Sequence, residues 1–543
     1  MSLWTILCSG LLGMGIVFLG VPLVLSCARV IGLRPRVQDL HHTQQQPVPR
    51  LGGLVLAVAF VGIELFSVAC NPLERERQVE SWVVALSSLA MFGLGFWDDL
   101  KPLGAKKKLL GQVAIATAVW AFGIGVDRFK IPFTDRVFDL HAWGMLLTLA
   151  WLVGMTNLIN LIDGVDGLAG GICLMLMTLL AYVGFNGGSF GLLASGMAGA
   201  LLGFLWFNFP PARIYLGDGG AYFLGFQIGL YAILSSHKGT VVAALVAPLF
   251  VLALPILDMT LAILRRGLRG LPIFRPDRKH IHHHLLGMGL SRRRAVLSLY
   301  AVTLVFLAMG FAAFASRGQA IPLLLGIAMI ILLICAGRLS FSREWFAVGR
   351  VLGNSLGMRQ EVQYALALTR WLALEGGRCN SVEELWANLV FAAQRLGFTS
   401  IRLTLEDGQR VWNHPNACES GLSVRQELQH RRCGILELSA PNCDNDRSDP
   451  ASTCPRATAD GRPFCPCVSD EKVFSILSEL LIEGWMKAAM RWNDRGQAPL
   501  RFDAGIVSPK NRQQDLFPSA ASIPPSPPPR PKHANLHGGS AVG

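Results

Sequence analysis

Two apolar runs joined by a short acidic turn occupy residues 142–185, which read AWGMLLTLAWLVGMTNLINLIDGVDGLAGGICLMLMTLLAYVGF. The runs near 142–160 and 168–186 approach the roughly 20 apolar residues that a helix needs to cross a bilayer. A helix also satisfies its own backbone polar groups, as hydrocarbon surroundings require. This stretch therefore predicts two membrane-spanning helices joined by a polar turn at the membrane surface.

Similar apolar segments recur along the first 337 residues. The chain of 543 residues is 52% hydrophobic and only 16% charged, and its mean hydropathy is +0.43. Soluble proteins carry roughly 25% charged residues, so a single soluble domain is excluded. We predict an all-α polytopic membrane domain over 1–337, with eleven spans near 4–30, 51–70, 81–97, 109–126, 142–160, 168–186, 190–208, 220–236, 240–264, 295–315 and 319–337.

Basic residues are divided unequally between the loops. With the N-terminus outside, 17 Arg and Lys residues fall in one set of loops and seven in the opposite set. The positive-inside rule makes the first set cytoplasmic, and an odd number of spans leaves the C-terminal region cytoplasmic as well. Membrane orientation explains the net charge of +13 better than nucleic acid does, so we expect no nucleic-acid partner.

The last 200 residues alternate between helix-like and strand-like patterns. We predict a small cytoplasmic α+β accessory domain over 338–495 and a disordered Pro-rich tail over 496–543. Ser381, Glu384 and Gly397 provide a capping box and a C-cap for a helix over 382–396. Two strands are expected over 401–405 and 435–438 and a second helix over 473–492. The four cysteines between 443 and 467 match zinc spacing poorly and are expected to be reduced thiols.

Adjacent carboxylates end the third predicted span, where Asp98 and Asp99 precede Lys108 and Gln112. Neighbouring carboxylates repel one another, and a divalent cation or a nearby Lys explains them best. A solvated helix end with membrane-orienting lysines is the alternative. We expect Asp98 and Asp99 to be catalytic and metal-binding, and Lys108 to bind substrate.

The acidic turn of the opening stretch carries the second group of polar residues. Spacing by three places Asn157, Asn160 and Asp163 on one helix face, and two Asp-Gly steps allow a tight turn that ends at Asp166. A satisfied contact between helices is the alternative. We predict substrate binding by Asn157 and Asn160 and a catalytic role for Asp163 and Asp166.

Two further loops carry charge. Asp218, in the stretch RIYLGDGG over 213–220, is a candidate cap for the eighth span or a metal ligand. The longest cytoplasmic loop reads RPDRKHIHHH over 275–284. Six basic residues nearby oppose a zinc ion, whereas Arg and neutral His donate hydrogen bonds to phosphate. A basic loop facing anionic lipids is the alternative. The predicted phosphate-binding residues are Arg278, His280, His282 and His283.

Acidic loops able to hold Mg²⁺ and a basic loop for a phosphorylated ligand, all on one membrane face, indicate phosphoryl transfer. These four motifs, in this order, resemble the polyprenyl-phosphate N-acetylhexosamine-1-phosphate transferases, glycosyltransferase family 4. The resemblance covers roughly 1–337 and is greatest to the bacterial undecaprenyl-phosphate N-acetylglucosamine-1-phosphate transferase branch. It implies ten or eleven transmembrane helices in the bacterial inner membrane, with a cytoplasmic active-site cleft.

The resemblance also implies the reaction. Sugar 1-phosphate, most simply N-acetylglucosamine 1-phosphate, passes from a UDP-N-acetylhexosamine to undecaprenyl phosphate with release of UMP, supported by Mg²⁺ or Mn²⁺, as the initiating step of a cell-envelope polysaccharide. It implies that Asp98 and Asp99 serve the metal–pyrophosphate centre and that Asp218 is a metal ligand. Residues 157–166 are implied to line the nucleotide and catalytic cleft, and the three histidines to bind the phosphates or the sugar. The sequence is also compatible with a homodimer.

The sequence departs from the family in two places. Asp39 and Leu40 stand where a basic pair is usual before the motif PVPRLGG over 47–53. His284 is followed by two leucines rather than by the acidic motif of phospho-N-acetylmuramoyl-pentapeptide transferases, so that substrate ranks second. A secondary transporter is the rival class, but transporters place ionisable groups near the bilayer midplane, where Glu64 and Asp258 are the main carboxylates here.

Overall fold

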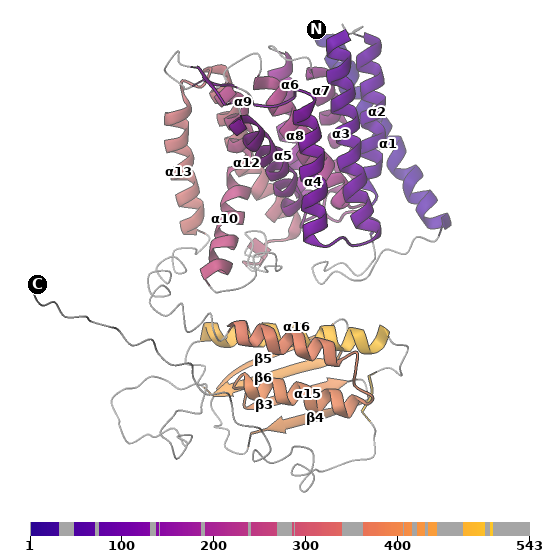
Figure 1. The fold of residues 1–543 in the computed structure, drawn as a ribbon, viewed down its shortest axis with the longest axis vertical. Coiled ribbons are helices and arrows are strands. Elements are labelled where there is room, and N and C mark those ends of the chain that lie inside the picture. The colour runs from indigo at the N-terminus through magenta and orange to yellow at the C-terminus, as the bar shows by residue number, and fades with distance from the viewer. Residues whose placement is uncertain are drawn as a thin grey trace, which may run out of the picture. The chain divides into compact units, whose positions relative to one another are not determined.

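The computed structural model describes residues 2–31, 48–70, 75–126, 128–130, 137–140, 142–185, 190–236, 241–268, 285–286, 288–338, 362–405, 407–414, 421–428, 433–441, 471–494 and 500–502. The chain divides into two compact units, Met1–Gln360 and Glu361–Gly543. The first unit is a bundle of helices and the second an antiparallel sheet with helices (Figure 1).

Long apolar helices build the first unit. They are α1 (Leu3–Ile31), α2 (Gly52–Cys70), α3 (Arg75–Leu100), α4 (Ala105–Ala121), α5 (Ala142–Ile162), α6 (Leu168–Phe185), α7 (Gly191–Asn208), α8 (Gly217–Ser236), α9 (Val241–Val251), α10 (Ala253–Leu268), α12 (Arg292–Ala315) and α13 (Ile321–Arg338). Among the described residues, seven helices are long and apolar enough to cross a membrane: α1, α2, α3, α5, α6, α7 and α12. The chain is therefore a multi-pass membrane protein, and the count of eleven spans stays a prediction.

The predicted single span over 240–264 is wrong in one respect, because two helices, α9 and α10, replace it. The break falls at Leu252, three residues before Pro255. Proline lacks a backbone N–H and is tolerated in the first turn of a helix but not in its interior. Pro255 therefore fits the start of α10 and interrupts a continuous helix.

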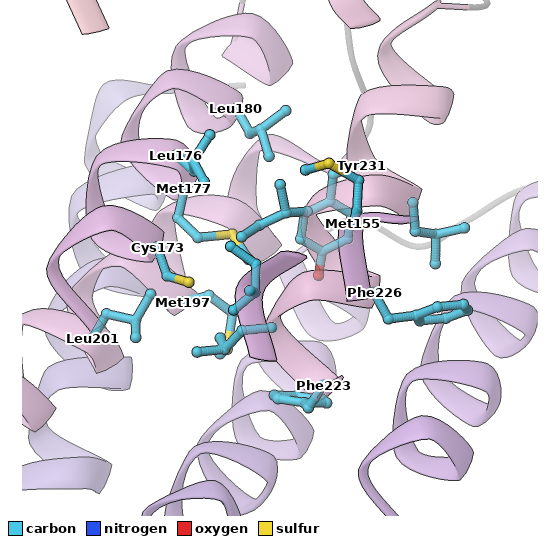
Figure 2. Packing of buried hydrophobic residues seen from close by; sticks show 14 of the residues in the cluster. Met155, Cys173, Leu176, Met177, Leu180, Met197, Leu201, Phe223, Phe226 and Tyr231 are labelled. Carbon is cyan, nitrogen blue, oxygen red and sulfur yellow. The ribbon is translucent and has the colours of Figure 1, made fainter. Parts of the chain in front are cut away.

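The core of the bundle lies among α5, α6, α7 and α8. Figure 2 shows side chains from these helices packed together, including Met155, Cys173, Met197 and Phe226. Glycine allows the closest helix approach elsewhere, since a Cβ on Gly199 of α7 would overlap the backbone of α1. The backbones of α1 and α7 are thus in close contact at Gly199.

A short hairpin was missed by the all-α prediction. Strands β1 (Arg128–Lys130) and β2 (Val137–Asp139) pair antiparallel between α4 and α5. Strands of three residues carry too little alternation to be recognised from sequence.

The second unit contains an antiparallel sheet in the order β4-β3-β6-β5. Its strands are β3 (Ser400–Leu405), β4 (Gly408–Asn413), β5 (Gly421–Glu427) and β6 (Ile435–Pro441). Helix α16 (Glu471–Asp494) packs against β5, β6 and α15 (Val382–Arg395). A further helix covers 362–375.

The predicted helices of this unit are confirmed. The Ser381 hydroxyl accepts a hydrogen bond of 3.1 Å from the Glu384 amide, and Gly397 has a φ of 84° after α15. The prediction of two strands is incomplete, because β4 and β5 are half-exposed and carry Gln, Arg and Glu where apolar alternation was sought. The cysteines between 443 and 467 and the tail beyond 502 lie outside the described residues.

Candidate functional site

An ion-paired lysine joins the ends of three segments at one end of the bundle. The Lys108 ammonium, in the first turn of α4, contacts Asp98 Oδ2 at the end of α3 and lies 3.3 Å from Asp218 Oδ2 on α8. The Asp98 side chain is 5% exposed, and its Oδ1 accepts a hydrogen bond of 2.6 Å from the Leu103 amide. One cation therefore joins the buried Asp98 carboxylate to the partly exposed Asp218 carboxylate, which comes from a distant part of the sequence.

The second member of the acidic pair caps α8. Asp99 Oδ1 and Oδ2 accept hydrogen bonds of 3.1 Å and 2.9 Å from the amides of Asp218 and Gly219. Gly217, with φ of 76°, has no room for a Cβ beside the Asp99 carboxylate. The alternative that Asp218 itself caps the helix is wrong, because Asp99 caps it from a neighbouring helix. With both oxygens accepting amide hydrogen bonds, Asp99 holds the first turn of α8, and its expected roles in metal binding and catalysis stay predictions.

The amide side chains of α5 reach two partners on the same side of the helix. Asn160 donates a hydrogen bond of 3.0 Å to Asp218 Oδ1, and Asn157 donates one of 2.6 Å to Gln112 Oε1 on α4. Because Gln112 lies one turn after Lys108, the two residues share one face of α4. The structure thus brings together three of the four predicted loops through direct hydrogen bonds and ion pairs.

The acidic turn between α5 and α6 adds two carboxylates. Burial and the negative charges of Asp218 and Asp99 raise the pKa of Asp163 well above its ordinary value of 3.8, and Arg50 opposes the shift. Asp166 Oδ2 accepts a hydrogen bond of 3.2 Å from the Ala212 amide. Burial and the neighbouring negative charges thus both disfavour the ionised form of Asp163.

Arg50 reaches the site through backbone pairing that sequence patterns did not reveal. The segment before α2 runs beside the segment before α8: the Tyr215 amide donates to the Pro49 carbonyl, and the Gly52 amide donates to the Tyr215 carbonyl, both at 2.9 Å. Burial, together with the charge of Asp166, raises the pKa of Tyr215 to about 12. The motif over 47–53 is thereby tied to the acidic cluster, although only the family resemblance had singled it out.

The described carboxylates fit a magnesium ion that completes its shell with phosphate. Within the described ranges, no three His, Cys, Asp or Glu side chains are grouped as ligands of one metal. Mg²⁺ commonly takes one or two carboxylates and fills its remaining positions with water and substrate phosphate.

The predicted phosphate-binding residues Arg278, His280, His282 and His283 lie outside the described residues, so their predicted roles stay predictions. The same holds for Asp39 and the neighbouring histidines.

An apolar groove opens beside the end of α5 that carries Asn160. It has a cavity volume of about 50 Å³, and Asp258 and Thr303 are polar residues in an otherwise largely hydrocarbon lining. The lining comes from α5, α6, α10 and α12 and includes Leu158, Ile162, Leu254, Met259 and Leu299.

Comparison with known proteins is consistent with this geometry. The family described as Glycosyl transferase family 4 matches residues 81–236. The chain is 33% identical over 289 residues to the probable undecaprenyl-phosphate N-acetylglucosaminyl 1-phosphate transferase of Bacillus subtilis strain 168, covering 52% of this chain and 78% of that protein. It is 31% identical over 293 residues to the decaprenyl-phosphate N-acetylglucosaminephosphotransferase of Mycobacterium tuberculosis, covering 49% and 71%.

A third relative represents the alternative substrate class. The chain is 29% identical over 323 residues to the phospho-N-acetylmuramoyl-pentapeptide-transferase of Listeria innocua, covering 56% of this chain and 97% of that protein. All three matches are long enough to include most of the helical bundle.

Proposed function

Since this chain belongs to glycosyl transferase family 4, we propose that it transfers N-acetylhexosamine 1-phosphate from a UDP-sugar to undecaprenyl phosphate and releases UMP. It is an enzyme of the phosphotransferase type. N-acetylglucosamine 1-phosphate is the proposed group, and the product would begin a cell-envelope polysaccharide. The observation that supports this proposal most strongly is the contact of Lys108 with both Asp98 and Asp218, which places charged groups together where a diphosphate can bind.

The proposed chemistry is a direct displacement. A phosphate oxygen of the lipid attacks the sugar-linked phosphorus of the UDP-sugar and forms a new P–O bond. The bond from that phosphorus to the bridging oxygen of the diphosphate breaks, and the bridging oxygen leaves as part of UMP. A phosphate monoester has a second pKa near ~6, so the attacking oxygen is largely ionised at neutral pH and needs little help from a base. Asp98 or Asp99 as base or covalent nucleophile is the alternative.

The side chains of the site would act mainly by binding and by charge. Lys108 and Arg50 are positioned to attract the phosphates, and Asn160 holds Asp218 in place. We propose that Asp98, Asp163 and Asp218 supply the carboxylates for Mg²⁺ or Mn²⁺, which would neutralise charge on the transferred phosphoryl group. In such a transfer, positioning and charge neutralisation contribute more than covalent participation by the protein.

The acceptor would enter from the lipid. The apolar groove is lined by Leu158 and Ile162, near the end of α5 that carries Asn160, and we propose that part of the polyprenyl chain lies there with its phosphate at the cluster. We place the site at the cytoplasmic face of the bacterial inner membrane, because UDP-sugars are cytoplasmic metabolites and the loops flanking the site are the basic set.

Two alternatives differ in support. The Listeria innocua relative keeps a muramoyl-pentapeptide donor as the second candidate. A secondary transporter has less support than either, because Glu64, a carboxylate within a span, accepts a hydrogen bond from Ser81 inside the bundle rather than lining the polar cluster.

The test is transferase activity of the purified full chain with Mg²⁺ and undecaprenyl phosphate. UDP-N-acetylglucosamine, UDP-N-acetylgalactosamine and UDP-N-acetylmuramoyl-pentapeptide are supplied separately, and UMP release is measured with and without the lipid. We expect lipid-dependent UMP release with the first donor. Release with the pentapeptide donor alone would select the second candidate, and no release with any donor would contradict the proposal.

A further inference from the structure

A tyrosine outside every predicted motif contacts the acidic turn. The hydroxyl of Tyr300, on α12, donates a hydrogen bond to the carbonyl of Gly167, the last residue of the turn. The same carbonyl accepts a hydrogen bond of 2.9 Å from the Gly171 amide in the first turn of α6. The end of the turn is therefore attached both to its own helix and to α12.

The close approach of Tyr300 depends on a glycine. A Cβ added to Gly171 would overlap the hydroxyl and ring of Tyr300. Any side chain at position 171 would therefore displace the tyrosine from the turn, because the obstructing atoms are the hydroxyl and the hydroxyl end of the Tyr300 ring. Gly171 and Tyr300 thus form one complementary pair across the α6–α12 contact.

A second attachment holds the other side of the same residue. The Gly167 amide donates a hydrogen bond of 3.0 Å to Asn208 Oδ1 at the end of α7, and Asn208 Nδ2 donates one of 2.8 Å to the Ile214 carbonyl. Gly167 has a φ of 79°, a conformation that glycine adopts without strain. Both backbone polar groups of Gly167 are thereby fixed by side chains from other helices.

This attachment fixes where the carboxylates of the turn lie. Asp166, adjacent to Gly167, accepts a hydrogen bond from the Ala212 amide, so the turn and the segment before α8 are tied side by side. Arg293, also on α12, donates a hydrogen bond of 2.6 Å to the Pro210 carbonyl in that segment. Helix α12 therefore contacts both polypeptide segments that flank the acidic cluster.

We propose that Tyr300 and Gly171 are positioning residues for the transfer reaction, holding in place the turn that carries Asp163 and Asp166. The inference rests on the proposed function. Neither residue touches the proposed reacting groups, so their effect is exerted through the position of the turn. A displacement of about 1 Å in a catalytic group can lower a rate by about 100-fold, so a lost contact of this kind has a measurable consequence.

The experiment compares three variants of the full chain with a matched control. Tyr300→Phe removes only the hydroxyl, Gly171→Ala displaces the ring, and the double variant does both. Tyr182→Phe is the control, because Tyr182 lies on α6 and packs edge-on against Phe311 of α12, with ring centroids 5.1 Å apart. It removes the same atom from the same pair of helices away from the turn.

We expect kcat to fall about tenfold in Tyr300→Phe and in Gly171→Ala, with the donor KM within about twofold of wild type. The double variant should resemble Gly171→Ala alone, because both changes remove one interaction and their effects are not additive. Hydrogen exchange of the peptide over 162–171 should be faster in both single variants, and Tyr182→Phe should match wild type in every measurement.

Three results separate the possible outcomes. Wild-type kcat in Tyr300→Phe, with unchanged hydrogen exchange over 162–171, would overturn the positioning role while leaving the proposed function intact. A multiplicative loss in the double variant, accompanied by lower thermal stability and unchanged exchange in the turn, would reduce the pair to a packing contact and also overturn it. An inactive wild type with faster exchange in the variants would instead contradict the proposed function.

Discussion

Asp99 accepts a hydrogen bond of 3.1 Å from the backbone amide of Asp218, so one carboxylate of the acidic cluster fixes the position of another. The helix whose first turn Asp99 caps is the helix that carries Asp218. The three carboxylates of the cluster therefore have different contacts. Asp98 forms an ion pair with Lys108, and Asp99 caps α8. Asp218 forms an ion pair with Lys108 and accepts a hydrogen bond from Asn160. This difference in contacts leads to distinguishable effects of substitution.

Replacing Asp99 by Ala should reduce both stability and activity. Loss of an N-cap costs about 1 kcal/mol, and the released amides would no longer fix Asp218. Thermal unfolding in detergent and transferase rates measure the two effects. Ser381→Ala is the control, since it removes the cap of α15 in the other unit. It should lower the stability of that unit and leave kcat unchanged. Equal kcat in Asp99→Ala and Ser381→Ala would contradict the role of Asp99.

Removing the charge of Lys108 should abolish most of the activity. In Lys108→Met, Asp98 remains buried without its cation, and the donor phosphates lose a positive charge, so we expect a loss of about 100-fold in kcat/KM. Lys107→Met is the matched control because Lys107 is exposed on the same turn of α4. Its rate should stay within about twofold of wild type. Similar losses in the two variants would show that general surface charge, rather than the ion pair, is important.

Asp163 should make the stability of the metal-free protein depend on pH. Its pKa is raised in the folded protein, chiefly by burial, so between the ordinary value of 3.8 and the raised value the folded state binds more protons than the unfolded state. The free energy of unfolding therefore falls as pH rises through this window. Thermal unfolding in EDTA should show Asp163→Asn losing less stability with rising pH than wild type does.

Metal provides the complementary measurement for Asp163. If the cation binds its ionised carboxylate, adding Mg²⁺ should release protons and remove the pH-dependent difference between wild type and Asp163→Asn. If the stability of the two proteins in EDTA depended on pH in the same way, Asp163 would not be the group with the raised pKa.

The second compact unit should be dispensable for the chemical step. Every described contact within the acidic cluster comes from the first unit, Met1–Gln360. A chain ending at residue 360 should therefore retain lipid-dependent UMP release within about threefold of the full chain, because the reacting groups keep their supports. A stable, monodisperse shortened protein without activity would show that the α+β domain contributes directly to the transferase.

Sequence patterns predicted the helical bundle and the acidic cluster for related reasons. Apolar runs and the charges at their ends are both local properties, so Asp98, Lys108, Asn160 and Asp218 could be selected before their contacts were known. The metal-binding and catalytic roles of these residues stay predictions. The ion pair of Lys108 with Asp218 could not be derived, because it depends on how α4 and α8 pack.

Other features depend wholly or partly on tertiary structure. Asp99 was selected as a metal ligand because it adjoins Asp98, whereas its oxygens meet amides that begin α8. Tyr300 and Gly171 gave no sequence signal, since an aromatic residue and a glycine in apolar helices are ordinary packing residues. The division of one predicted span into α9 and α10 had a local signal in Pro255. The sequence did not show whether this proline lay inside one helix or near the start of a second.

The most direct test follows the phosphorus atom that is transferred. UDP-N-acetylglucosamine labelled with ³²P at the sugar-linked phosphate is incubated with undecaprenyl phosphate, Mg²⁺ and either wild-type protein or Asp218→Asn. The account predicts that wild-type protein moves the label into a lipid-linked sugar diphosphate while unlabelled UMP appears in equal amount, and that Asp218→Asn does neither. Label that stays in the aqueous phase with wild-type protein, or unchanged lipid labelling by Asp218→Asn, would contradict it.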